Sequence, residues 1–187
     1  MVNPNYKVFL DILQGDLLAI FEHQKEYVCC KEGCSLCCES GNYPITNLEA
    51  EFLKEGYTSL PEELKKEISL KITKLKENPQ EMYECPFLIN KRCSVYEHRP
   101  LICRTFGVLS SKSSGGYTVP FCQEEGLNYA DVYIGEKRTF DWDKIKEKGY
   151  IHPPRPFNLS LKSLIAMDIV KELGLEFGEI KKMIDYL

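Results

Sequence analysis

Residues 29–38 read CCKEGCSLCC, which places five thiols within ten residues. Gly33 lies inside this stretch and gives the backbone the freedom to fold back on itself. Deprotonated thiolates are soft, anionic ligands that select zinc, copper(I) or iron–sulfur assemblies over hard cations. The stretch therefore predicts a fold in which the chain wraps around a metal centre.

The whole chain has nine cysteines in 187 residues. Its first residues lack the cationic start and unbroken apolar run of a secretory signal, and the cysteine count is odd. Both features indicate a reducing compartment, where clustered cysteines usually serve metal or redox chemistry. We therefore expect a cytoplasmic protein with reduced thiols, with a disulfide scaffold as the alternative.

The rest of the composition is that of a folded globular protein, with 43% apolar and 28% charged residues. No apolar run approaches the roughly 18 residues of a spanning helix, so we expect no membrane segment. The 24 basic and 28 acidic residues are interleaved and give a net charge of −4, which argues against a nucleic-acid interface. We expect a single domain over residues 1–187, with a metal-binding core at about 29–123 and helical flanks.

A second set of cysteines lies in residues 84–123, where prolines, aromatic residues and short apolar runs replace helical periodicity. The set consists of Cys85, Cys93, Cys103 and Cys122. The four thiolate ligands of a tetrahedral metal site could come from the first cysteine set, from the second set or from both. Residues 113–116 read SSGG between two short apolar runs, which predicts a small β-hairpin.

Outside the cysteine-rich stretch, apolar residues recur at three- and four-residue steps, as in amphipathic helices. A capping box formed by Thr46 and Glu49 starts one of these helices, and Gly56 is its predicted end. Further helices are predicted from Pro4 to about residue 21, over 61–78, 141–148 and 158–174, and over 177–187. The expected fold class is mainly α, with helices packed around an irregular cysteine-rich metal-binding knot that has a small β-hairpin.

The order of the motifs resembles that of the YkgJ-type cysteine cluster family, also described as a zinc- or iron-chelating domain. The family is marked by a C-x3-C-x2-C-C box, and the four cysteines of residues 30–38 have this spacing. Its second hallmark is similar to four motifs of this chain, CPFL at 85–88, CSVY at 93–96, RP at 99–100 and CRTF at 103–106. The resemblance implies metal binding by cysteines but no reaction. The predicted metal ligands are Cys30, Cys34, Cys37, Cys38, Cys85, Cys93, Cys103 and Cys122.

These donors leave iron–sulfur and zinc open. Zinc sites usually combine two C-x2–4-C hooks, which are not cleanly visible here, whereas iron–sulfur clusters accept more varied spacings. Eight thiols also exceed what one zinc requires, so we favour an iron–sulfur cluster of the [4Fe–4S] type, with Zn²⁺ as the alternative. A cluster bound by thiolates carries excess negative charge, which nearby cations and N–H donors would offset. Arg99, Arg104 and Tyr96 lie close to Cys93 and Cys103 in the sequence and are predicted to bind the cofactor.

Two functions remain open. The protein could be a metal or cluster binder that serves as a structural, carrier or electron-transfer module. It could also be a metal- or cluster-dependent enzyme, such as a methyl or group transferase related to the flagellin lysine N-methylases, in which similar boxes occur. No G-x-S-x-G, H-E-x-x-H or phosphate-loop motif is present, so no catalytic residue is assigned.

The spacing of Cys30, Cys34 and Cys37 also matches the three-cysteine site of radical S-adenosylmethionine enzymes. Leu36 stands where those enzymes usually have an aromatic residue. In addition, 187 mostly helical residues cannot supply their partial α/β barrel. These two departures argue against that superfamily.

Overall fold

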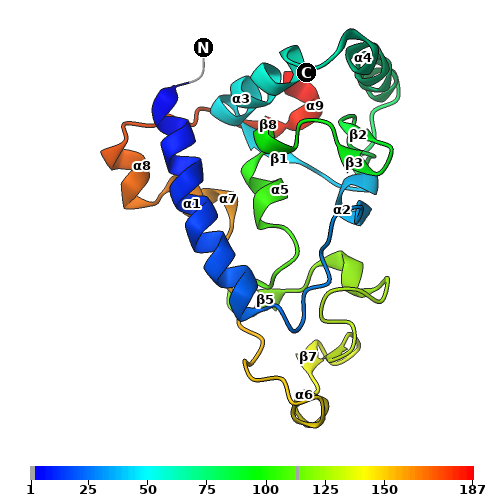
Figure 1. Cartoon of the computed structure of the whole chain (residues 1–187), viewed down its shortest axis with the longest axis vertical. Coiled ribbons are helices and arrows are strands. Elements are labelled where there is room, and N and C mark those ends of the chain that lie inside the picture. Colours follow the sequence, from blue (N-terminus) through cyan, green and yellow to red (C-terminus); the bar gives the residue numbers. More distant parts are fainter. Residues whose placement is uncertain (1–2, 113) are drawn as a thin grey trace. The chain divides into compact units, whose positions relative to one another are not determined.

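The computed structural model describes residues 3–112 and 114–187. In these residues the fold is mainly helical, with the α-helices α1–α9 and four pairs of short antiparallel strands (Figure 1). The chain divides into two compact units. Unit 1 consists of Met1–Phe9, Glu32–Arg104 and Ile165–Leu187, and unit 2 of Leu10–Lys31 and Thr105–Leu164. No helix of the described residues is long and apolar enough to cross a membrane.

Helix α1 (Pro4–His23) confirms the first predicted helix and is the long blue helix of Figure 1. Pro4 occupies its first position, where a missing N–H removes no intrahelical bond. In unit 1 the buried ring of Tyr6 packs edge-on against Phe52 and Phe177, with centroid distances of 5.3 and 5.9 Å. These rings join the start of α1 to α3 and to the C-terminal segment.

Helix α3 (Asn47–Thr58) begins at the predicted capping box. The Thr46 hydroxyl accepts a hydrogen bond from the Glu49 amide, and the Glu49 carboxylate accepts one from the Thr46 amide. The predicted end at Gly56 is wrong, because the helix continues for two residues. Gly56 instead allows a close approach, since a Cβ there would lie 2.6 Å from Cγ of His98.

Helix α4 (Glu62–Glu77) follows, with Asn78 as its C-cap residue, so it stops at the predicted Asn78-Pro79 pair. Its buried Ile68 joins the core of unit 1, which also contains Ile45, Leu53, Phe87 and Met183. Cys85 is part of this core, and three further cysteines, Cys38, Cys93 and Cys103, pack against it. Cys85 therefore lies within a conventional apolar core, and Cys38, Cys93 and Cys103 lie at its edge.

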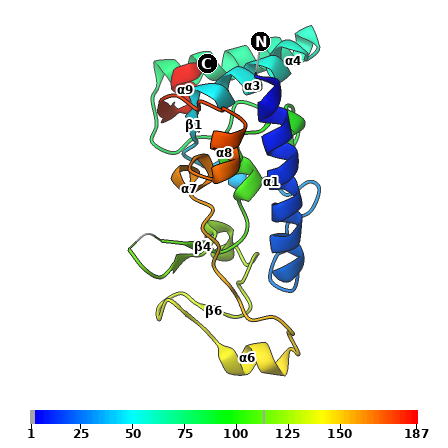
Figure 2. The same cartoon turned by 90° about the vertical axis from the view of Figure 1, so that its left-hand side faces the viewer.

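The C-terminal segment differs from the prediction. The helix expected over 158–174 is two helices, α7 (Leu161–Ile165) and α8 (Asp168–Glu172), because Met167 between them has an extended backbone. The helix expected over 177–187 is wrong in its first half, where β8 (Ile180–Lys182) pairs antiparallel with β1 (Pro44–Thr46). This ladder satisfies backbone groups that a helix would have bonded internally. Only α9 (Met183–Tyr186) is helical, and it packs beside α3 (Figure 2).

Unit 2 contains the predicted hairpin. Strands β4 (Ser110–Ser111) and β5 (Tyr117–Thr118) pair with Ser110 opposite Thr118, while position 113 of the turn lies outside the described residues. A second hairpin, β6 (Tyr133–Ile134) with β7 (Thr139–Phe140), was not predicted. The helix expected at 141–148 is confirmed as α6 (Trp142–Glu147). The buried core of the unit consists of Tyr27, Leu109, Tyr129, Val132, Phe140 and Ile145.

An ion pair in unit 2 makes stability depend on pH. Asp131 Oδ2 lies 2.8 Å from Lys148 Nζ and accepts a 2.7 Å hydrogen bond from Tyr150. Burial alone would raise the pKa of Asp131, but the bonds from Lys148 and Tyr150 outweigh it and lower the pKa. A carboxyl with a lowered folded-state pKa stabilises the fold above its unfolded pKa of about 3.9, and this contribution is lost as pH falls through the folded value.

We therefore expect Asp131→Asn to lower the free energy of unfolding at pH 7 by at most about 1 kcal/mol, since the pair is partly exposed. At a pH below the lowered folded-state pKa of Asp131, the variant and the wild type should converge, because Asp131 is then protonated in both states. Urea unfolding of the metal-free protein at both pH values measures this. An equal difference at the two pH values would contradict it.

Candidate metal centre

Backbone hydrogen bonds join the two cysteine sets inside unit 1. Gly41 and Tyr83 exchange both of their backbone bonds, at 3.0 and 3.1 Å, as an antiparallel bridge. Next to this bridge the Cys85 amide donates to the Cys38 carbonyl at 2.8 Å. Cys38, at the end of the first cysteine box in α2 (Leu36–Glu39), is therefore held beside Cys85.

A tight hairpin brings Cys93 to the same place. Strands β2 (Leu88–Ile89) and β3 (Arg92–Cys93) pair with Leu88 opposite Cys93. The two turn residues, Asn90 and Lys91, have φ angles of 49° and 61°, as a type I′ turn requires. The chain thus doubles back five to six residues after Cys85, and Figure 1 shows α2 next to this hairpin.

The fourth segment is α5 (Leu101–Thr105), which carries Cys103. Glu49 anchors the start of this helix, because its Oε1 accepts a 2.7 Å hydrogen bond from the Leu101 amide. Its Oε2 accepts bonds from the amide and hydroxyl of Thr46, both at 2.8 Å. Glu49 is only 1% exposed. One buried carboxylate therefore fixes the helix that bears Cys103 to the start of α3.

The outcome in unit 1 is a group of five thiols that interact electrostatically: Cys37, Cys38, Cys85, Cys93 and Cys103. The sulfurs of Cys37 and Cys38 lie 3.9 Å apart. Their hydrogen bond lowers the pKa of Cys37 to about 7 and raises the pKa of Cys38. Burial, with a smaller contribution from neighbouring thiolates, raises the pKa of Cys85 to about 12, and the same two causes raise the pKa of Cys103. The group cannot ionise fully without a compensating cation.

The positive charge of Arg99 acts on two thiols of this group, Cys37 and Cys93. Burial raises the pKa of Cys93, and the charge of Arg99 opposes that rise. The guanidinium carbon lies 3.7 Å from the centre of the exposed Tyr96 ring, which stacks against it. Among the described residues the buried Nε of Arg99 has no hydrogen-bond partner. The N–H group at Arg99 Nε is therefore suited to donate a hydrogen bond to a sulfur atom.

The other predicted cofactor contacts have supporting roles in the structure. Arg104 Nε donates to the Arg99 carbonyl at 3.0 Å, and its Nη2 donates to the Glu97 carbonyl at 2.6 Å. Arg104 therefore braces the loop that carries Arg99, including the short 3₁₀ helix η1 (Tyr96–His98). The ring of His98 packs 4.6 Å from that of Phe52 and holds η1 against α3.

The remaining predicted ligands lie elsewhere. Cys34 is exposed in unit 1, just before α2. Cys30 and Cys122 belong to unit 2, where Cys30 Sγ accepts a 3.2 Å hydrogen bond from Asn128 and Cys122 is buried in η2 (Phe121–Gln123). Cys29, which was not predicted as a ligand, is exposed. Five of the eight predicted ligands thus lie within electrostatic reach of one another in unit 1, and the ligand role of all eight stays a prediction.

Two residues position the backbone of the cysteine-bearing segments through contacts that the sequence did not indicate. The Tyr43 hydroxyl donates to the Cys37 carbonyl at 3.0 Å and so ties the first box to β1. Glu49 was recognised as part of a capping box, but its bond to Leu101, 52 residues away, was not. Both act on the backbone that presents the sulfurs rather than on the sulfurs themselves.

The donor set fits a thiophilic metal. All nine cysteines lie in the described part of the chain, and none forms a disulfide. Soft, reduced thiols together with an unpartnered donor suit zinc, iron or an iron–sulfur cluster. No three metal-ligating side chains among the described residues are spaced to hold one ion, so a metal-binding knot is not shown and single-ion binding would require the thiols to close in.

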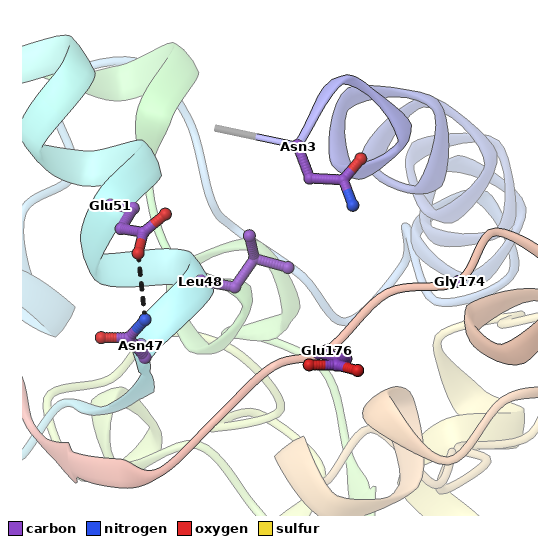
Figure 3. A pocket seen from close by; sticks show the side chains of 6 residues that line it. All are labelled: Asn3, Asn47, Leu48, Glu51, Gly174 and Glu176. Atoms are coloured by element: carbon purple, nitrogen blue, oxygen red, sulfur yellow. Dashed lines mark hydrogen bonds between the residues drawn. The ribbon is translucent and has the colours of Figure 1, made fainter. Parts of the chain in front are cut away.

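A separate pocket in unit 1, of about 300 Å³, has different chemistry. Figure 3 shows its lining, in which Asn47 donates to Glu51. The lining residues are Asn3, Asn47, Leu48, Glu51, Gly174 and Glu176. The pocket offers oxygen and amide groups but no thiol. Thiophilic metal chemistry in unit 1 therefore belongs to the cysteine group.

Comparison with known families agrees with this chemistry. Residues 29–123, just over half of the chain, match the model of the CxxCxxCC family, described as "Putative zinc- or iron-chelating domain". The chain belongs to this family. The matched CxxCxxCC residues include all nine cysteines and the loop with Arg99 and Arg104, which confirms the predicted resemblance and supports metal binding in general. No curated protein and no solved structure shows significant similarity to the chain.

Proposed function

We propose that this CxxCxxCC protein holds an iron–sulfur cluster, of the [4Fe–4S] type, as an electron-transfer, carrier or structural module. The ligands are drawn from the eight predicted cysteines. The observation that carries the proposal is that five free thiols of unit 1 lie within electrostatic reach of one another. The charge of Arg99 acts on two of them, Cys37 and Cys93, and among the described residues its buried Nε has no hydrogen-bond partner. A reducing compartment such as the cytoplasm suits thiols kept for this purpose.

Electrostatics explains why such a group needs a metal. Burial disfavours the thiolate forms of Cys85 and Cys103 and raises their pKa values. Iron bound by these sulfurs supplies the positive charge that stabilises buried thiolates. When bound, the cluster supplies one-electron transfer at a potential set by its charge, its exposure and hydrogen bonds to sulfur. In this proposal the chain supplies the thiolates, and Arg99 supplies both charge and a hydrogen bond.

Two features favour a cluster over a single zinc ion. Five thiols lie within electrostatic reach of one another, whereas a structural zinc ion takes four ligands. The free donor of Arg99 matches the hydrogen bonds that stabilise cluster sulfurs. These features support iron–sulfur binding as the first candidate.

One observation favours zinc as the second candidate. A tetrahedral site with zinc–sulfur bonds of about 2.3 Å places its sulfurs roughly 3.8 Å apart. The sulfurs of Cys37 and Cys38 are 3.9 Å apart, close to one edge of such a tetrahedron. Zinc at this position would be structural. The group-transferase alternative stays a prediction, since no contact in the structure favours it.

The experiment is elemental and spectroscopic analysis of the whole protein purified without oxygen. We expect iron and acid-labile sulfide in stoichiometric amounts, with broad visible absorbance. Cys85→Ala should lose this metal. Cys29→Ala is the matched control, because Cys29 is exposed and is not a proposed ligand, and it should retain the metal. Tightly held zinc without sulfide would replace the cluster by the second candidate, and a protein with neither metal would overturn both.

A further inference from the structure

Asn128 lies five residues beyond the part of the chain that matches the family, and its side chain contacts Cys30. Asn128 is 1% exposed and belongs, like Cys30, to unit 2. Its Nδ2 donates to Cys30 Sγ at 3.2 Å and to the Gly107 carbonyl at 2.7 Å. Its Oδ1 accepts a hydrogen bond from the Cys29 amide at 2.8 Å.

These bonds determine which way the amide points. The Cys29 amide can only donate and the Gly107 carbonyl can only accept, so a flipped side chain would place donor against donor and acceptor against acceptor. The N–H groups of Asn128 therefore face the sulfur. A buried polar side chain with every group engaged also has little freedom to turn.

Gly107 closes the other side of the same sulfur. Its φ of +108° is a conformation that L side chains rarely adopt. A Cβ at this position would lie 2.9 Å from Cys30 Sγ and 3.2 Å from Asn128 Nδ2. Glycine is thus required both by the backbone conformation and by the space that the sulfur occupies. Although Cys30 is exposed, Asn128 and the Gly107 backbone therefore restrict the position of its sulfur on two sides.

We infer that Asn128 is a positioning residue for Cys30 as a metal ligand. It fixes the backbone at Cys29, places the sulfur before metal arrives, and donates a hydrogen bond that stabilises the metal-bound thiolate. This inference rests on the proposed function, and it adds a residue outside the matched region to the metal-binding apparatus. Hydrogen bonds to ligand atoms of this kind are typically worth about 10- to 100-fold in metal affinity.

The test compares Asn128→Asp in the wild-type protein and in Cys30→Ala. Aspartate keeps an acceptor for the Cys29 amide but cannot, when ionised, donate to the sulfur or to Gly107. In the wild-type background we expect metal affinity to fall by about 10- to 100-fold. In Cys30→Ala, which itself has weakened affinity, the same change should have little further effect, because the sulfur through which Asn128 acts is absent.

Affinity is measured by chelator competition, without oxygen, on the metal that the wild-type protein carries. Thermal unfolding of the metal-free proteins reports separately on the fold. Asn158→Asp is the matched control, since Asn158 is exposed and bonds only nearby serines, and it should match the wild type. Equal losses of affinity from Asn128→Asp in both backgrounds would show a merely structural role and overturn the inference.

Two further variants decide the matter if Asn128→Asp does not fold. Cys30→Ala removes the sulfur but keeps the hydrogen bonds of Asn128 to the backbone at Cys29 and Gly107. Gly107→Ala keeps the Asn128 side chain but crowds the sulfur. Both variants should weaken metal retention. Full retention in Cys30→Ala, with loss in Cys85→Ala, would overturn the role of Asn128 and leave the proposed function intact. A wild-type protein that binds no metal would overturn both.

Discussion

Glu49→Ala is expected to lower the free energy of unfolding by about 3 kcal/mol or more, because it leaves several buried donors without an acceptor. These donors are the amide and hydroxyl of Thr46 and the Leu101 amide, and both residues are fully buried. The substitution also removes half of the capping box that starts α3. Urea unfolding of the metal-free protein measures the loss.

Two variants separate this network from a general effect of removing an acidic residue. Glu51→Ala lies in the same helix but is exposed, so its effect should stay within about 0.5 kcal/mol. Glu49→Gln should cost less than Glu49→Ala, since glutamine is accepted in a capping box but offers only one acceptor oxygen. Equal stability of Glu49→Ala and Glu51→Ala would refute the role assigned to Glu49.

The consequence for the metal centre follows from geometry. Glu49 holds the first turn of α5, and Cys103 is the third residue of that helix. Releasing the turn should therefore also weaken metal retention, although Glu49 binds no metal itself. Burial raises the pKa of Glu49 above that of an ordinary carboxyl, against the hydrogen bonds that lower it. The carboxylate of Glu49 thus loses its hydration on burial, and the hydrogen bonds of the network offset only part of this loss.

The second large effect is expected for Cys103→Ala, which should abolish metal retention. Its buried thiol belongs to the five-sulfur group of unit 1 and interacts electrostatically with Cys85, Cys93 and Cys37. Because metal binding is also folding energy, about 10–16 kcal/mol for structural zinc in small domains, the metal-loaded protein should lose several kcal/mol of stability. The metal-free protein should lose only about 1–2 kcal/mol, for a small cavity.

Differential scanning calorimetry of loaded and metal-free samples, with metal analysis of each, tests this difference. Cys29→Ala again serves as the control and should behave as the wild type in both states. If Cys103→Ala keeps its metal and its loaded melting temperature, Cys103 is not a ligand. If it loses as much stability without metal as with it, its role is packing alone.

Features that depend on neighbours in the sequence could be predicted. The capping box links Thr46 and Glu49, the end of α4 before Asn78 depends on the following proline, and the pairing of β4 with β5 depends on the two glycines between them. Each is settled within a few residues, where the backbone has few alternatives. The clustered cysteines likewise predicted metal binding, and the resemblance of their motifs predicted the family, before any contact was known.

Local patterns failed where a distant partner was decisive. The spacing of Phe177, Ile180 and Ile184 is that of a helix, yet Ile180–Lys182 is a strand because β1 supplies hydrogen bonds. Gly56 has the character of a helix end, yet the helix continues because the glycine makes room for His98. In both cases tertiary contacts outweighed an intrinsic preference of about 1 kcal/mol or less per residue.

The sequence by itself determined that this chain is mainly helical, that its cysteines remain available for metal, and that it belongs to a metal-chelating family. Only the tertiary structure decided which thiols lie together, and that Glu49 reaches Leu101 and Asn128 reaches Cys30, across 52 and 98 residues. The physical reason is the distance along the chain over which each interaction acts. Composition and short hydrogen-bonded motifs act between neighbours, whereas a buried polar side chain takes its partners from whichever segments the folded core brings beside it.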